Sequence, residues 1–275
     1  MPIKIFAYVE IEEELPTREL KPKHIHGLFF QMIGEETGEF FHKGAVKPFT
    51  LFCRELFKEK ETTRKLHLEI NVLKPELFGP IAKELTLNAF KRELKVGGKR
   101  ADFTGFKVTE AESYKELMKL PPEKDFTLQF KSPTSFKRGN YDYPLPDPTL
   151  IVKSLTRKWN TFSPDKVPVE VAKKLGNSLV PSGCWIKTQK VELSDRAKIT
   201  GFRGRVFLYL PEEEREIKRW ANALFNFAKY AGVGRKTTMG FGKVGLVKLP
   251  ASLEDNGSQA KEANSLEEQN KQLPL

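Results

Sequence analysis

Two halves of the chain repeat one order of predicted secondary structure, and this repeat limits the possible folds more than any other feature. Residues 3–11 and 66–73 alternate apolar and polar side chains, which is the pattern of strands. Residues 22–36 and 75–92 have helical patterns, and a strand pair is expected around residues 97–98. The order that we assign to this half is strand, helix, strand, strand, helix, strand.

The helix predicted over residues 22–36, with Pro22 near its start, carries one apolar face. Its apolar residues recur at the helical period of 3.6: Ile25, Leu28, Phe29, Met32 and Ile33. We expect this face to pack on a sheet.

After Pro121-Pro122 the same order recurs with more insertions. The strands predicted in this half are residues 126–130, 184–193, 201–210 and 241–249. The predicted helices are residues 147–160, 168–176 and 212–230. The last helix has the clearest buried face in the chain, formed by Ile217, Trp220, Ala221, Leu224 and Ala228. Residues 212–214, all glutamates, are expected on its first turn, where the helix dipole favours acids.

Two βαββαβ units in tandem resemble duplicated ferredoxin-like domains, an α+β fold shared with RNA-recognition modules. We expect a first domain over residues 1–120 and a second domain over residues 121–250. Residues 251–275 are polar and rich in Asn, Gln and Glu, and we predict that they form a disordered tail.

A glycine-rich stretch, AGVGRKTTMGFGKV (residues 231–244), follows the last helix. Its residues with candidate binding roles are Gly232, Gly234, Arg235, Lys236, Thr237, Thr238, Gly240 and Gly242. Glycine lets consecutive N–H groups turn toward one anion, and the side chains add positive charge and hydroxyl donors. A polyanion is therefore the predicted partner.

Two better-known phosphate loops do not fit this stretch. A Walker A loop needs G-x-x-x-x-G-K-[ST], and a dinucleotide fingerprint runs from strand to loop to helix, whereas here the helix comes first. Hydrolysis of nucleoside triphosphates and hydride transfer are thus disfavoured. A structural explanation stays open, in which Gly232 ends the helix and a flexible connection follows.

The formal net charge of +11 supports a polyanionic partner, because the last 25 residues contain five acids and only two lysines and leave the rest still more basic. Such an excess favours nucleic acid or an anionic surface. The alternative is a soluble, charge-rich protein, since a content of 30% charged residues is also common in thermophiles.

Cysteine content and the N-terminus indicate a reducing, cytoplasmic setting. The two cysteines, Cys53 and Cys184, lie far apart and predict neither a disulfide framework nor a zinc knuckle. Acids appear at Glu10 and again at residues 12–14 before any long apolar run, so neither secretion nor a membrane location is expected.

Three of the four histidines fall within nineteen residues, which suggests a shared site. His24 and His26 lie on the first turns of the first helix, where the helix dipole favours a neutral imidazole, the form of a general base. His42, in the loop expected after that helix, is a complementary acid or base, and Lys47 can stabilise a phosphorane-like transition state. The alternative is that all three are ordinary surface or turn residues. His67, on the polar side of a strand, has an expected structural role.

Metal chemistry has little support, because no cluster of Asp, Glu and His has the spacing of a two-metal nuclease or a zinc site. We expect no metal and no cofactor. A pair of H-x-[ST] motifs, as in two-histidine phosphoesterases, is also missing.

The strand GFRGRVFLYL adds a second candidate RNA surface. Its Arg203, Arg205, Phe207 and Tyr209 point to one side, and arginine with aromatic groups on a sheet face can hold phosphates and stack on bases. Burial of the two aromatic residues under a helix is an equally good explanation. Lys153, Arg157 and Lys158 on the 147–160 helix add positive surface, although a pair such as Lys153 and Arg157 is often only solvated.

SPTSF after a strand, the KSLTRKWNTF helix, the GFRGR strand and the GVGRKTTMGFG loop occur together here. This combination resembles the CRISPR-associated endoribonucleases that process precursor RNA into guide RNAs, and the resemblance covers most of residues 1–250. It implies metal-independent cleavage of repeat RNA, in which a 2′-hydroxyl attacks the adjacent phosphate. The implied products are a 2′,3′-cyclic phosphate, or 3′-phosphate, and a 5′-hydroxyl.

The resemblance also implies roles for single residues. The family's catalytic histidine, usually just beyond the first helix, matches His42. Many members place a tyrosine on that helix, whereas this chain has none between residues 9 and 113 and has His26 in the corresponding place. Lys47 matches the lysine found shortly after the histidine. The glycine-rich loop would bind the RNA backbone without cleaving it.

The implied partner is precursor CRISPR repeat RNA, with a CRISPR interference complex and a second copy of the chain as further candidates and no membrane. The sequence does not decide which histidine is the base. It also leaves open a different class of function, a noncatalytic RNA-binding subunit of a CRISPR ribonucleoprotein complex.

Overall fold

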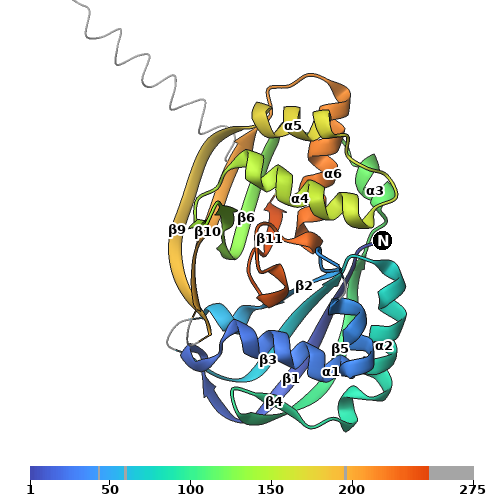
Figure 1. Cartoon of the computed structure of the whole chain (residues 1–275), viewed down its shortest axis with the longest axis vertical. Helices are drawn as coiled ribbons and strands as arrows, with labels where there is room; N and C mark the ends of the chain where they lie inside the picture. The colour runs from blue at the N-terminus through green and yellow to red at the C-terminus, as the bar shows by residue number, and fades with distance from the viewer. Residues whose placement is uncertain (43, 59–60, 195–196, 248–275) are drawn as a thin grey trace, which may run out of the picture.

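The computed structural model describes residues 1–42, 44–58, 61–194 and 197–247, with the side chain of His42 outside the described groups. Its strands form a five-stranded sheet, a four-stranded sheet and a two-stranded hairpin (Figure 1). The predicted tail at residues 251–275 lies outside the described residues. Within them, no helix is both long enough and apolar enough to cross a membrane.

The first sheet has the strand order of a ferredoxin-like domain. Its strands are β1 (Ile3–Pro16), β2 (Phe49–Cys53), β3 (Thr62–Val72), β4 (Leu94–Val96) and β5 (Lys99–Ala111). They lie in the order β2-β3-β1-β5-β4, with neighbours antiparallel. The helices of this half are α1 (Pro22–His42) and α2 (Phe78–Leu87). Apart from the edge strand β4, this is the βαββαβ arrangement that the sequence predicted.

The second sheet repeats that arrangement. Its strands are β6 (Asp125–Thr134), β9 (Val180–Ser194), β10 (Ala197–Tyr209) and β11 (Val244–Val247), in the order β11-β6-β10-β9. The hairpin consists of β7 (Phe136–Arg138) and β8 (Tyr141–Tyr143). The helices are α3 (Tyr114–Lys119), α4 (Pro148–Phe162), α5 (Val169–Ser178) and α6 (Arg215–Ala231). The prediction of two tandem ferredoxin-like domains is confirmed.

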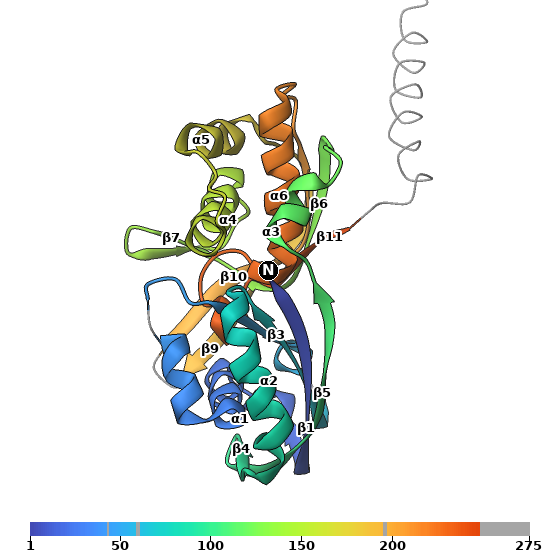
Figure 2. The ribbon, with the colours of Figure 1, turned by 90° about the vertical axis from the view of Figure 1, so that its right-hand side faces the viewer.

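Short 3-10 turns connect several elements: η1 (Thr17–Glu19), η2 (Arg54–Phe57), η3 (Pro75–Leu77), η4 (Ala89–Lys91) and η5 (Thr237–Met239). Figure 2 shows α1, α2, α4 and α5 on one side of the molecule and β1, β5, β6 and β11 on the other.

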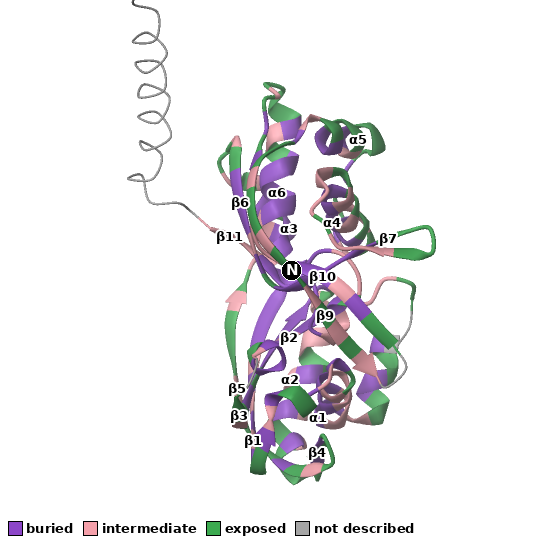
Figure 3. Cartoon of the chain, turned by 90° about the vertical axis from the view of Figure 1, so that its left-hand side faces the viewer, coloured by how far each residue is buried: buried purple, intermediate pink, exposed green. Residues whose placement is uncertain are grey.

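Each sheet buries one face under its helices, as the periodicity predicted. The α1 residues Ile25, Leu28, Phe29, Met32 and Ile33 are fully buried in the core of the first half. The α6 residues Ile217, Trp220, Ala221, Leu224 and Ala228 are buried in the core of the second half. Figure 3 shows α6 as mostly buried.

Several elements differ from the sequence pattern, among them the last strand, which begins at Val244 and not at residue 241. The short strand β2 was not predicted, and α1 extends beyond residue 36. The prediction that residues 212–214 form the first turn of the last helix is wrong, because α6 begins at Arg215 with Glu214 as an extended N-cap residue. The carboxylate of Glu212 instead accepts hydrogen bonds from the N–H groups of Glu213 and Glu214, at 3.0 and 3.1 Å. These acids therefore precede the helix.

The hairpin of β9 and β10 joins the two halves. It arches from the second sheet down to the first half of the chain (Figure 1). There, Val191 of β9 packs against the core that α1 and the first sheet form. Arg203 of β10 makes a further link, because its Nη1 donates to the carbonyl oxygen of Phe57 at 3.5 Å.

Candidate nucleic-acid interface

The end of α1 leads into a segment that lines a cleft between the two domains. Gly34 has non-helical backbone angles (φ 73°, ψ 167°), so α1 is kinked there and then continues to His42. Phe41, fully buried, anchors this last turn. His42 was predicted in a loop but is the last residue of α1. Its side chain is outside the described groups, so its catalytic role stays a prediction.

A cleft of about 450 Å³ opens where the segment after α1 meets α4 and the glycine-rich loop. Figure 1 shows these three elements on the same face of the molecule. Seven lining residues are basic: Lys47, Lys137, Lys153, Arg157, Lys158, Arg235 and Lys236. Among the described residues that line the cleft there is no Asp or Glu. Its surface therefore has a positive potential suited to a polyanion.

Hydrogen bonds connect the two domains across this cleft. Arg157 of α4 donates through Nη2 to the carbonyl oxygen of Ala45 at 3.4 Å, and Ala45 belongs to the segment after α1. In the same segment, Lys47 Nζ donates to the carbonyl oxygen of Gly44 at 3.0 Å. The structure thus brings Lys47, Lys153 and Arg157, predicted from separate parts of the sequence, to one place.

His26 links α1 to the glycine-rich loop. Its Nδ1 lies 2.9 Å from the carbonyl oxygen of Thr238. Because a carbonyl oxygen only accepts, Nδ1 carries the hydrogen, and Nε2 holds the lone pair of the neutral ring. The rings of Phe30 and Phe49 lie 4.9 and 6.2 Å from the imidazole, measured between centroids. His26 is therefore held at the edge of the cleft that Thr238 lines.

The other two histidines make local contacts. His24 Nδ1 accepts a hydrogen bond from the backbone N–H of Lys21 at 3.2 Å, at the start of α1. His67 Nδ1 lies 3.1 Å from a carboxylate oxygen of Glu55. These contacts suit structural roles for both.

The glycine-rich loop is shaped by its own packing. A Cβ on Gly242 would lie 2.0 Å from the carbonyl oxygen of Val233, and one on Gly234 would lie 2.4 Å from that of Ser135. Both glycines also have positive φ, 68° and 80° respectively. Gly232 is the C-cap residue of α6, as in the structural explanation that the sequence left open. The sequence argument gave phosphate approach as the reason for the glycines, whereas close backbone packing accounts for at least these two.

The two threonines of the loop differ in their surroundings. Thr237 is buried, and its hydroxyl accepts a hydrogen bond from Lys158 Nζ at 3.1 Å. Thr238 is half-buried and lines the cleft. Arg235 also lines the cleft and pairs with Asp142 of β8.

Arg203 and Arg205 lie away from the cleft, on the outer face of the second sheet. Arg205 Nε donates to Gln129 Oε1 at 2.9 Å, and Arg203 lines a separate hollow of about 820 Å³. Trp185, which is 69% exposed, lines the same hollow and packs edgewise on Phe207 with ring centroids 5.4 Å apart. Phe207 and Tyr209 are not buried under a helix, so the outward alternation predicted for this strand is confirmed.

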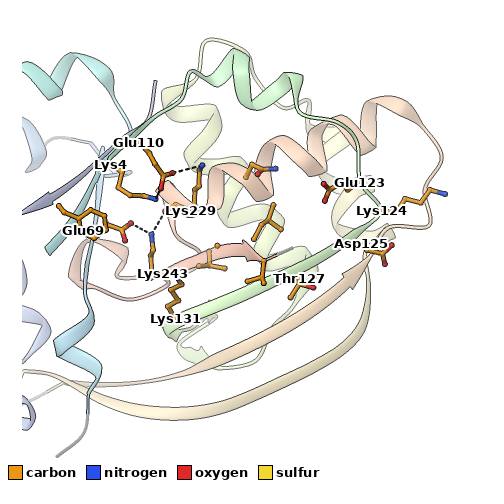
Figure 4. A pocket seen from close by; sticks show the side chains of 16 residues that line it. Lys4, Glu69, Glu110, Glu123, Lys124, Asp125, Thr127, Lys131, Lys229 and Lys243 are labelled. Atoms are coloured by element: carbon orange, nitrogen blue, oxygen red, sulfur yellow. Dashed lines mark hydrogen bonds and ion pairs between the residues drawn. The ribbon is translucent and has the colours of Figure 1, made fainter. Parts of the chain in front are cut away.

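A third hollow, of about 840 Å³, lies between the sheets and is lined by paired charges. Figure 4 shows Lys4 beside Glu110 and Lys243 beside Glu69, with Lys229 also directed at Glu110. Burial alone would raise the pKa of Glu110, but hydrogen bonds from Lys4 and Lys229 lower it to about 2. Lys4, Lys229 and Lys243 are thus paired with glutamates.

Sequence reasoning missed the cleft residue Ser154 on α4, and it grouped Lys158 with Lys153 and Arg157 as positive surface, whereas Lys158 is buried. Ser154 Oγ accepts a hydrogen bond from the N–H of Gly234 at 2.9 Å. Lys158 is buried and falls seven residues after the buried Ile151, on the same helix face. A lysine on the apolar face of a helix was the signal that could have identified it.

Comparison with known proteins identifies similar sequences. A family model described as CRISPR-associated endoribonuclease Cas6 matches residues 128–244. A protein of that name from Streptococcus thermophilus is 23% identical over 254 residues, which make up 88% of this chain and 96% of the relative.

Solved structures agree with this result. A Cas6 of Thermus thermophilus, solved as a product complex, is 27% identical over 90% of this chain and 99% of its own, with a TM-score of 0.77. Another Cas6 product complex has 26% identity, coverage of 89% and 100%, and a TM-score of 0.73. That second protein has also been solved with a substrate mimic and as a mutant in which alanine replaces a histidine.

Proposed function

This chain belongs to the Cas6 family of CRISPR-associated endoribonucleases, and from that membership we propose that it cleaves the repeats of precursor CRISPR RNA without a metal ion and so releases guide RNAs. The observation that carries the proposal is the basic cleft beside the segment after α1, whose lining includes no Asp or Glu among the residues that the structure describes. Divalent Mg²⁺ prefers oxygen ligands such as carboxylates, whereas ammonium and guanidinium groups suit a phosphate.

The proposed reaction is an internal transesterification. A base removes the proton of the 2′-hydroxyl, whose oxygen then attacks the adjacent phosphorus. The bond from phosphorus to the 5′-oxygen breaks, and an acid returns a proton to that oxygen. The products are a 2′,3′-cyclic phosphate and a 5′-hydroxyl. Histidines suit both proton transfers because the imidazole titrates near neutral pH.

We assign His42 and His26 as the acid and base pair, in either order. Support for His26 comes from its fixed tautomer, which directs the lone pair to Nε2. Support for His42 comes from its backbone position at the end of α1, three residues before Ala45, which lines the cleft. Lys47 lines the cleft and supplies positive charge for the developing oxyanion. In this proposal the histidines belong to the first domain, and the boundary at residues 120 and 121 stays a prediction.

RNA would contact two surfaces. In the cleft, the residues that would hold phosphates are Lys153, Arg157, Arg235, Lys236 and Thr238. The shape of the loop backbone would be set by Gly232, Gly234, Gly240 and Gly242, together with the buried Thr237. On the outer sheet face, Arg203 and Arg205 would add contacts beside the exposed Trp185. Base stacking on such an aromatic side chain is typical of single-stranded RNA binding.

The second candidate function is a noncatalytic RNA-binding subunit. The test incubates the full chain with a repeat RNA in excess EDTA, in parallel with the same RNA carrying a 2′-deoxy nucleotide at the cut site. Cleavage of the first and not of the second is the expected result. Binding without cleavage would support the noncatalytic subunit. Cleavage that requires added metal, or that persists on the deoxy substrate, would overturn the proposed chemistry.

A further inference from the structure

A buried lysine lies at the base of the cleft and takes no part in the chemistry proposed above. Lys158 of α4 is 9% exposed. Its Nζ donates to the carbonyl oxygens of Ala231 and Gly232 at 2.5 and 3.2 Å, and to Thr237 Oγ1 at 3.1 Å. These three acceptors match the three N–H groups of one protonated ammonium.

The acceptors come from both ends of one segment of the glycine-rich loop. Ala231 is the last residue of α6 and Gly232 is its C-cap, so the ammonium also meets the negative end of the helix dipole. Thr237 begins η5, five residues later. The segment between them carries Arg235 and Lys236 into the cleft. Lys158 thus fixes the two ends of the segment that faces the ligand.

We propose that Lys158 is a positioning residue: its protonated ammonium holds the glycine-rich loop in the shape that receives a phosphate group, and an anion in the cleft in turn favours the protonated form. The identity of that anion as RNA rests on the proposed function. The proposed coupling between anion binding and protonation of Lys158 involves only the glycine-rich loop and does not depend on RNA cleavage.

The charges around Lys158 support this coupling. The groups that face the cleft with it are Lys153 and Arg157 of α4, Lys47 after α1, Lys137 of β7, and Arg235 and Lys236 of the loop. Asp142 of β8 pairs with Arg235, and Lys229 of α6 pairs with Glu110 and Glu112. Burial, with a further contribution from Arg157, lowers the pKa of Lys158 to about 7. A bound anion opposes both effects and raises that pKa again.

The direction of the pH effect follows from these pKa changes. Below pH 7 the lysine is protonated with or without the anion, so affinity does not depend on its titration. Above pH 7 the unliganded lysine loses its proton, and binding must restore it. Anion affinity therefore falls as the pH rises, and binding takes up a proton from solution.

The experiment measures proton uptake by isothermal titration calorimetry of the full chain at pH 8, in two buffers with different ionisation enthalpies. At this pH, histidines with ordinary pKa values are already neutral and exposed lysines are still charged. One probe is inorganic sulfate, whose charge is constant between pH 7 and 9. The other is an RNA oligonucleotide made uncleavable by 2′-deoxy substitution.

For the unaltered protein we expect uptake of most of one proton per anion bound, and an affinity that falls about tenfold between pH 7 and 9. Lys158→Arg keeps a permanent charge and should bind without proton uptake and without that fall. Lys153→Met, on the exposed side of the same helix, should weaken binding but leave proton uptake unchanged. Proton uptake equal in the unaltered protein and in Lys158→Arg, or absent from both, would overturn the inference.

A folding defect is controlled by comparing the thermal unfolding of each variant with that of the unaltered chain. If Lys158→Arg fails to fold, the absence of proton uptake by the unaltered protein still decides against the inference. The proposed function fails separately: if RNA is never cut but sulfate binding takes up a proton, only the cleavage proposal is lost. If RNA is cut in EDTA and no proton is taken up, only the role of Lys158 is lost.

Discussion

The two domains enclose two lysine-rich spaces that differ in one respect, the presence of carboxylates. In the hollow between the sheets, Lys4, Lys229 and Lys243 pair with Glu110 and Glu69 (Figure 4). In the cleft beside α4, none of the described lining residues is acidic. Positive charge is paired with glutamates in the hollow between the sheets, whereas in the cleft only Arg235, through Asp142 outside the lining, has a carboxylate partner described above.

This difference shows why net charge alone does not locate a binding surface. A buried ion pair satisfies its own electrostatics, so its lysine has little to gain from a phosphate. A lysine or arginine without an acidic neighbour lowers its energy when an anion arrives. The cleft is therefore the better candidate for binding, although both spaces contain several lysines.

The largest expected effect is on stability, in the paired hollow. Lys243→Met leaves Glu69 buried without its cation and should lower the free energy of unfolding by about 3–5 kcal/mol. Chemical denaturation measures the change. The double substitution with Glu69→Gln should recover most of the loss, because no uncompensated charge remains. Lys131→Met, an exposed lysine of the same hollow, serves as a control and should cost no more than about 0.5 kcal/mol.

In the cleft, the largest effect should be on rate. His42→Ala is expected to slow repeat cleavage by roughly 10²-fold or more while leaving RNA affinity nearly unchanged, the usual scale for a lost general acid or base. Single-turnover cleavage and a binding titration measure the two quantities. His24→Ala is the matched control on the same helix, because the hydrogen bond from Lys21 to His24 lies at the start of α1 and His24 does not line the cleft. An equal loss in both variants would contradict the assignment.

A smaller effect, the salt dependence of RNA affinity, distinguishes the cleft from the hollow between the sheets. Arg157→Ala removes a cleft cation, so RNA binding should weaken and the slope of log affinity against log salt should decrease by about 1. Lys229→Met removes a cation that already pairs with Glu110 and Glu112, and the slope should stay the same. If both variants change the slope equally, the paired hollow also binds RNA.

The smallest effect concerns acid stability. The pKa of Glu110 in the folded protein is about 2, below the ordinary value of 4.5. Its stabilising contribution is therefore present above pH 4.5 and is lost as the pH falls from 4.5 to 2. Glu110→Gln should flatten the decline of the unfolding temperature over this interval. Glu36→Gln, an exposed residue of α1, is expected to leave the decline unchanged.

Periodicity predicted the fold well where one face of an element is buried by its own domain. The apolar stripe of α1 and the alternation of β10 are such cases. It failed where the second domain covers a surface that a single unit would leave exposed. Glu69 and Asn71 lie on the polar side of β3 and are nevertheless buried. They meet Thr50 and Lys243, and no local pattern indicates that contact.

The candidate site was predictable in composition and not in arrangement. The glycine-rich loop, Lys153, Arg157 and the early histidines were visible as residue types. That these residues gather at one cleft, while Arg203 and Arg205 lie on the outer sheet face, depends on how the two domains pack, which spacing along the chain does not encode. Lys158 was predicted on the surface because a lysine in a basic helix resembles its exposed neighbours, although its position relative to Ile151 placed it on the buried face.

The packing of Val191 against the core of the first domain has a consequence for biosynthesis. The chain emerges from the ribosome N-terminus first, so the first sheet and α1 are made well before this valine. Until the hairpin that carries it has been translated, part of that apolar interior stays open to water. The nascent first half must therefore remain protected from aggregation until the second half arrives to close it.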